Sequence, residues 1–154
     1  EGAVSVMKNV TTELNNMQVS FSFKALYNPD EYRRYDSAVL YFNKHQYKTI
    51  YPMLQQVYSE NQDSFFAQVP LFTKQLAPGL GCAEEPTNKL AEKESFGTNR
   101  CQIIANGLIA AWQAGNNHPE SRMTAILEQF TLHKIKLRYP YLNGYSDDIY
   151  TTLD

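Results

Sequence analysis

Residues 17–26 read MQVSFSFKAL, and this stretch decides the fold class. Val19, Phe21 and Phe23 alternate with polar residues, which is the period of a β-strand with one buried face. After a turn, the apolar run from Ala38 to Phe42 predicts a second strand. Strands with one polar face are typical of an antiparallel sheet.

Helical periods surround these strands. Apolar residues recur at spacings of three and four in four stretches, namely residues 3–14, 46–61, 95–115 and 119–130. The second stretch contains Pro52, so we expect that helix either to begin near Tyr51 or to bend at the proline.

The third helix is expected to lie at the core of the domain. Either Ser95 or Thr98 caps its start, and Gly115 ends it. Its predicted apolar face consists of Cys101, Ile104, Ala105, Leu108, Ala111 and Trp112. Because Cys101 belongs to this face, we expect an inert, packed thiol there.

The stretch from Phe65 to Glu94 is irregular. Prolines and glycines interrupt it repeatedly, so we expect at most a short strand from Val69 to Thr73, and irregular stretches of this length are often functional. Alternation over residues 135–139 predicts a last strand. Helices and strands mix without a repeating strand–helix–strand order, which predicts an α+β fold, a small antiparallel sheet packed against several helices.

Composition narrows the class of protein. The 154 residues, 17.7 kDa, suit one domain spanning residues 1–154, and aromatic residues at 13% argue against disorder. The net charge of −2 shows no basic excess, so we expect no nucleic-acid binding. No apolar stretch is long enough for a membrane span. The chain begins with Glu1 and has no signal segment, so we expect a processed product or a piece of a longer protein.

The two cysteines, Cys82 and Cys101, favour free, partly buried thiols and an intracellular protein, with one disulfide as the alternative. The three histidines, His45, His118 and His133, have no metal-ligand spacing. No nucleotide-binding loop occurs, because Gly79-Leu80-Gly81 reads as a turn. We therefore expect neither a metal nor another cofactor.

Several cations lie among aromatic residues: Lys24, Arg33, Arg34, Lys74 and Arg100. Arg100 follows the predicted helix start, where an anion would be favoured by the helix dipole and could approach the backbone at Gly97. The alternative is an ion pair between Arg100 and one nearby carboxylate, from Glu84, Glu85, Glu92 or Glu94. For Lys24, Arg33 and Arg34, a solvated strand edge or helical face is favoured.

Four segments resemble the HopA effector family. They are FKALYNPDEYRRYDSAVLYF (Phe23 to Phe42), VPLFTKQLAPGLGCAEEP (Val69 to Pro86), ESFGTNRCQIIANGL (Glu94 to Leu108) and PYLNGYSDDIYTTLD (Pro140 to Asp154). The resemblance covers essentially the whole chain. The family is named for a Pseudomonas type III secreted effector and is common in cyanobacteria. Its full-length members are about twice as long, so the chain resembles their C-terminal portion.

The resemblance implies two alternative functions. Members in class-five lanthipeptide pathways act beside a kinase-like partner and eliminate phosphate from Ser or Thr of a phosphorylated precursor peptide, without metal. Effector members instead bind immune regulators, which implies a non-catalytic domain that binds a protein or peptide. The cyanobacterial character of the sequence favours a bacterial, cytoplasmic lyase over a secreted effector.

For the lyase, phosphate elimination needs a base, a cationic clamp and an acid. Lys24 or Lys74 would be the base, because neighbouring cations and partial burial can lower a lysine pKa. Arg100, with Arg33 or Arg34, would hold the phosphate, and His45 would be the acid.

Overall fold

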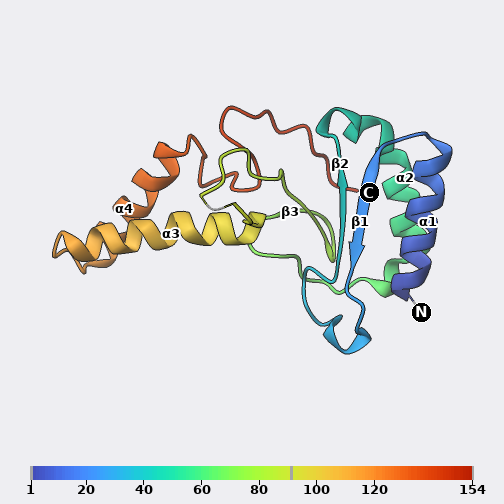
Figure 1. Ribbon diagram of the computed structural model, residues 1–154, viewed down its shortest axis with the longest axis horizontal. Helices are drawn as coiled ribbons and strands as arrows, with labels where there is room; N and C mark the ends of the chain where they lie inside the picture. Colours follow the sequence, from blue (N-terminus) through green and yellow to red (C-terminus); the bar gives the residue numbers. More distant parts are fainter. Residues whose placement is uncertain (1, 91, 154) are drawn as a thin grey trace. The chain divides into compact units, whose positions relative to one another are not determined.

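The computed structural model describes residues 2–90 and 92–153, and it confirms the α+β fold (Figure 1). The helices are α1 (Gly2–Asn16), α2 (Tyr47–Glu60), α3 (Phe96–Gln113) and α4 (Pro119–Leu132). The strands are β1 (Phe21–Ala25), β2 (Ala38–Phe42), β3 (Lys74–Ala77) and β4 (Leu80–Cys82). Short 3-10 turns lie at η1 (Pro29–Glu31), η2 (Lys44–Gln46) and η3 (Gln62–Ser64).

The chain divides into two compact units. Unit 1 comprises residues 1–70, 75–81 and 149–154, and unit 2 comprises residues 71–74 and 82–148. Each unit has its own cluster of buried apolar side chains.

Unit 1 is built from α1, α2 and the antiparallel pair β1–β2, in which Phe21 is opposite Phe42 and Ala25 is opposite Ala38. Its core consists of Val10, Leu14, Val19, Ile50, Met53 and Val57, against which one face of the sheet packs. The C-terminal segment joins this unit, because the Tyr47 hydroxyl donates to the carbonyl of Thr151 at 2.9 Å.

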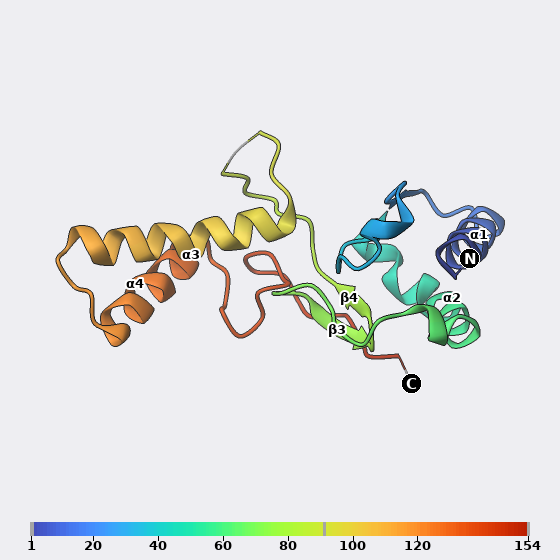
Figure 2. The same ribbon diagram turned by 90° about the horizontal axis from the view of Figure 1, so that it is seen from below.

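Unit 2 contains a hairpin of α3 and α4, which pack side by side in both views (Figures 1 and 2). Ile103, Phe130 and Ile135 form its buried cluster. The two helices approach each other closely at Gly107, where a Cβ would lie 2.6 Å from the Ile126 Cα. A side chain at residue 107 would therefore force the hairpin apart.

Three helices end in the same left-handed cap. The positive-φ residue is Gln18 after α1, Gly115 after α3 and Lys134 after α4. After α4, the Ile135 amide reaches back to the Phe130 carbonyl at 3.0 Å, and the Val19 amide reaches back to Leu14 in the same way after α1. These caps correct two predictions. β1 begins at Phe21 because Val19 still belongs to the cap, and residues 135–139 form turns that bury Ile135 instead of a strand.

The predicted strand from Val69 to Thr73 is also wrong. Phe72 has a φ of 71°, which breaks an extended run, and the strand begins at Lys74. Pro78 and Gly79, with a φ of 75° at the glycine, turn β3 into β4. The residues that sequence reasoning treated as breakers therefore make a hairpin.

The predicted helices are otherwise confirmed. α2 begins at Tyr47 and contains Pro52, so the alternative start near Tyr51 is wrong. Ser95, not Thr98, caps α3, with its hydroxyl accepting from the Thr98 amide at 3.2 Å. The expected core face of α3 is only partly buried, because Trp112 is 67% exposed.

Candidate functional site

Arg100 is the largest fully buried side chain of the described residues and lies within unit 2. Its Nε donates to the carbonyl of Pro140 at 2.7 Å, and one terminal nitrogen donates to the carbonyl of Leu142 at 3.1 Å. The other terminal nitrogen donates to the Asn99 side chain, and the guanidinium lies 5.0 Å from the centre of the Phe96 ring. Arg100 therefore fixes the segment after α4 to the start of α3.

Asn99 and Glu94 extend this network. The side-chain nitrogen of Asn99 (Nδ2) donates to Glu94 Oε2 at 2.9 Å and to the carbonyl of Asn88 at 3.1 Å. Glu94 Oε2 also accepts from the Leu90 amide at 2.7 Å. The irregular segment before α3 is thus organised by buried polar side chains, which is how an irregular backbone satisfies its hydrogen bonds.

The burial of Arg100 bears directly on its predicted role. Its side chain has no exposed area, and its donors point to backbone carbonyls, so in this conformation it contacts no ligand from solvent. Burial lowers the pKa of Arg100, and the carboxylates of Glu84 and Glu94 partly offset that effect. A buried guanidinium that donates to backbone carbonyls holds chain segments together, which is a structural role.

Lys74, a predicted base, lies beside the same segment. Its Nζ is 2.7 Å from Asp148 Oδ2 and 5.4 Å from the centre of the Tyr141 ring. The Tyr141 hydroxyl donates to the same Asp148 oxygen at 2.5 Å. Unit 2 therefore brings Lys74 and Arg100 to one stretch of chain, with Tyr141 between the two carbonyls that Arg100 binds.

Two neighbouring groups are held in their neutral forms. Burial, followed by the hydrogen bond to Asp148, raises the pKa of Tyr141. Burial and the charge of Glu84 raise the pKa of the Cys82 thiol to about 12.

The two cysteines are free, and Cys82 is partly buried, as expected. Cys101 is exposed, so the prediction of a packed thiol is wrong: α3 turns that side chain away from α4.

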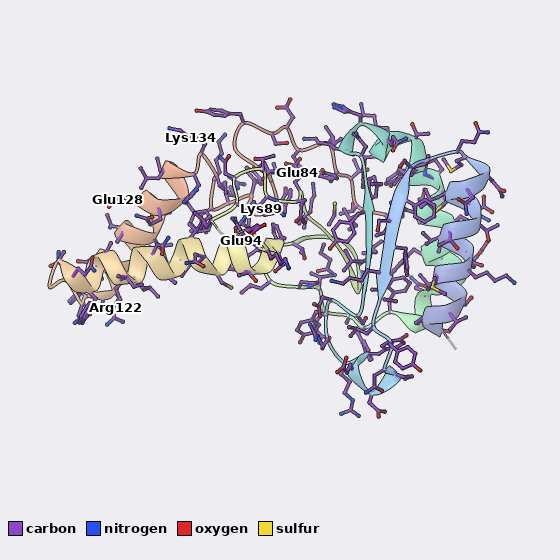
Figure 3. The ribbon with its side chains drawn as sticks, viewed as in Figure 1. Glu84, Lys89, Glu94, Arg122, Glu128 and Lys134 are labelled. Atoms are coloured by element: carbon purple, nitrogen blue, oxygen red, sulfur yellow. The ribbon has the colours of Figure 1, made fainter. Side chains whose placement is uncertain are left out.

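Glu84, which the sequence offered only as an ion-pair partner of Arg100, instead binds the segment after α4. Its carboxylate accepts from the Asn143 amide at 2.8 Å and from the Ser146 hydroxyl at 2.6 Å. Figure 3 shows Glu84, Lys89 and Glu94 gathered near the N-terminal end of α3. The partners of Glu84 lie about sixty positions away, so no local pattern could identify it.

Unit 1 holds the remaining predicted residues around the loop between β1 and β2, residues 26–37. Lys24 is exposed on β1 opposite Val39. Arg33 and Arg34 are exposed in the loop. Arg34 forms a bidentate ion pair with Asp36, in which Nε donates to Oδ1 at 3.0 Å and a terminal nitrogen donates to Oδ2 at 2.9 Å. Arg34 lowers the pKa of Asp36, and the charge of Lys24 adds a smaller effect.

The loop is well organised. The Leu26 amide donates to the Ser37 carbonyl at 2.9 Å, and the Tyr32 hydroxyl donates to the Leu26 carbonyl at 3.0 Å. The Asn28 side chain accepts from the Asp30 amide at 3.1 Å and caps η1. These bonds close the loop at its base and shape its tip.

Two tyrosines nevertheless face solvent from this loop. Tyr27 is fully exposed, at 101% of its reference area, and Tyr35 is 59% exposed. Arg33 makes no ion pair with any residue that the structure describes.

His45, the predicted acid, lies outside this loop. It is exposed in η2, where its backbone amide donates to the Asn43 side chain at 3.0 Å.

Within residues 2–90 and 92–153, no three His, Cys, Asp or Glu side chains gather in a way that could hold a metal ion. No helix in the same part of the chain is both long and apolar enough to cross a membrane.

The fold and these side chains define an α+β protein with a buried arginine network in one unit and an exposed tyrosine–arginine loop in the other. Comparison with protein families matches residues 1–142 to the HopA1 effector protein family. The chain therefore belongs to this family, as the sequence resemblance predicted. Comparison with curated proteins gives no match.

Proposed function

We propose that this protein is a recognition module that binds a peptide or protein through the loop of residues 26–37. The observation that carries this proposal is a well-ordered loop that leaves Tyr27 fully exposed and Tyr35 largely exposed. Tyrosine and arginine are the residue types that dominate binding energy at protein interfaces.

The order of the loop supports binding. A loop that is already closed by hydrogen bonds loses little conformational entropy when a partner docks. The Arg34–Asp36 pair and the Tyr32 hydroxyl hold the backbone, so the rings of Tyr27 and Tyr35 need no refolding to make contact.

The charges of the loop indicate the chemistry of the partner. Arg34 is paired with Asp36, whereas Arg33 is exposed and makes no ion pair with a described residue. Arginine binds carboxylates and phosphates with two parallel hydrogen bonds. A segment with one acidic or phosphorylated side chain next to apolar side chains would therefore match Arg33 and the two tyrosines.

The test is a selection of peptides from a random library on the immobilised chain, with the Tyr27→Ala/Tyr35→Ala double variant as the counter-selection. We expect peptides that bind the wild type and perturb backbone amide NMR signals of residues 26–37. Synthetic phosphoserine and phosphothreonine versions of those peptides would show whether phosphate strengthens binding. If every selected peptide binds the double variant equally well, the proposal is wrong.

A second candidate is phosphate elimination from a phosphorylated precursor peptide, and the placement of Lys74 supports it. Lys74 is held by Asp148 and Tyr141, whereas Lys24 lies on an exposed strand. In this reaction the Lys74 amine would take the α-proton, the Cβ–O bond would break, and phosphate would leave as the double bond forms.

Mass spectrometry of phosphoserine and phosphothreonine peptides incubated with the chain tests this second candidate. Dehydrated products that disappear in Lys74→Gln, but persist in Lys24→Gln, would support Lys74 as the base. Absence of turnover with the wild type and a kinase-like partner present would contradict it.

A further inference from the structure

The face of α3 that points away from α4 is apolar and exposed. It consists of Cys101, Ala105, Leu108, Ile109 and Trp112. At 100° per residue these five positions fall within one stripe of the helix. The opposite side of α3 packs on α4 through Ile103 and Gly107, so this helix is apolar on both sides. Such a helix is typically covered on both sides.

After Arg100, α3 carries no charged residue. The sequence has no Asp, Glu, Lys or Arg from residue 101 to residue 119. The labelled charges of the hairpin, Arg122 and Glu128, come from α4 (Figure 3). A partner held by charge is therefore disfavoured, and an identical copy of the face meets no like-charge repulsion.

The side chains of the stripe are arranged by size. Small residues, Cys101 and Ala105, occupy its first half, and large residues, Leu108 and Trp112, occupy its second half. Their spacing of four, three and four is that of the seam between two paired helices. If two copies of α3 lie antiparallel, Cys101 faces Trp112 and Ala105 faces Leu108, so every large side chain meets a small one.

We propose that the chain self-associates through this face of α3, as a two-fold dimer with antiparallel α3 helices. A two-fold axis between residues 106 and 107 generates both contacts at once, which is the symmetry that most homodimers use. The alternative parallel pairing would place Trp112 against Trp112 and leave a gap at Ala105. Antiparallel helix dipoles also attract each other.

The area of the stripe sets the strength of this dimer. The exposed parts of Leu108, Ile109 and Trp112 are 42%, 51% and 67% of each residue. With the two small residues, they amount to roughly 400 Å² per copy. Specific interfaces bury about 1,200 Å² or more in total. The two copies together would bury roughly 800 Å², which is less than that, so we expect a weak and reversible dimer.

Sedimentation velocity of the whole chain over a hundredfold concentration range tests the dimer. The expected result is a rise from the 17.7 kDa monomer toward twice that mass. Leu108→Glu and Trp112→Glu should each weaken association at least tenfold. Leu132→Glu is the matched control, because Leu132 is 68% exposed on α4 outside the stripe, and it should leave association unchanged. A wild type that stays monomeric, or an equal effect of all three variants, would overturn the proposal.

Oxidative cross-linking tests the direction of the helices, in a Cys82→Ser background. In the antiparallel arrangement, Trp112→Cys brings the new thiol to Cys101 of the second copy, so a covalent dimer should form. Cys101 alone should not cross-link, because the two copies of this residue lie about 16 Å apart along the helix axis. Cross-linking through Cys101 alone would show the parallel arrangement and overturn the antiparallel one.

Discussion

Arg100 and Arg34 use the same side chain in opposite ways. Arg100 is buried in unit 2 and donates to the carbonyls of Pro140 and Leu142. Arg34 is exposed in unit 1 and pairs with the carboxylate of Asp36. Both arginines lie close to aromatic residues in the sequence, so local sequence does not separate the buried arginine from the exposed one. Their difference comes from contacts with residues far away in the sequence.

The largest effect should come from Arg100→Ala. Removing this side chain leaves the carbonyls of Pro140 and Leu142 and the Asn99 side chain without their donor, and we expect a loss of about 3–5 kcal/mol in the free energy of unfolding. Urea denaturation monitored by circular dichroism measures it. Arg33→Ala, at an exposed position, should leave the midpoint unchanged. If both variants change the urea midpoint by a similar, small amount, Arg100 does not stabilise unit 2 as described.

A second large effect is expected at the α3–α4 contact. In Gly107→Ala the new methyl group would lie 2.6 Å from the Ile126 Cα, which is backbone and cannot move alone. We expect a loss of about 2–3 kcal/mol, measured by urea denaturation.

Gly97→Ala is the control in the same helix. No heavy atom lies within 4 Å of the Cβ position, so the substitution should stabilise the protein by about 0.5–1 kcal/mol. Equal effects at both glycines would contradict the close approach of α3 and α4.

The two cysteines should differ in reactivity. Because the pKa of Cys82 is raised to about 12, little thiolate forms there at pH 8, whereas Cys101 is exposed. We expect a thiol reagent to label Cys101 at least tenfold faster in the native protein. Mass spectrometry of labelled peptides measures both rates, and equal rates would show that Cys82 is not buried.

The raised pKa of Cys82 also predicts that the protein loses stability at alkaline pH. The folded state keeps the Cys82 proton at a higher pH than the unfolded state, so this contribution to stability is complete below the ordinary thiol pKa and declines up to about pH 12. Cys82→Ala should flatten that decline in urea midpoints measured between pH 8 and 10.

The smallest effect is expected for Arg34→Ala. This pair is exposed to solvent, so the urea midpoint should change little. The pKa of Asp36, which Arg34 lowers, should rise toward its ordinary value of 3.8 in a carboxyl NMR titration. The Asp36 contribution to stability is present above that value and is lost as the pH falls through the lowered pKa. An unchanged Asp36 pKa would show that the pair does not form in solution.

Much of the fold could be predicted because local patterns determine it. The alternation of Phe21 and Phe23 identified β1, the apolar run identified β2 over Ala38–Phe42, and Ser95 and Gly115 marked the ends of α3. The missed boundaries lie at Gln18 and Lys134, which adopt the left-handed conformation usually taken by glycine. Their carboxamide and ammonium side chains give no sign of that conformation.

The candidate site was harder to predict. The positions of Lys24, Arg33 and Arg34 on an exposed strand and loop match the solvated alternative that the sequence favoured. The burial of Arg100 depends on carbonyls forty positions away, and Asp148 reaches Lys74 over 74 positions. The face of α3 looked like core for a simpler reason: an apolar stripe has the same sequence pattern whether its partner is in the chain or outside it.

The most direct test of the proposed recognition function is the affinity of one selected peptide for the wild type and for Tyr27→Ala/Tyr35→Ala. The free energy of unfolding should be measured on the same samples. We expect binding to weaken at least tenfold while stability changes by less than about 0.5 kcal/mol, because exposed side chains contribute little to folding. Equal affinities for the two proteins would contradict a binding role for the loop of residues 26–37.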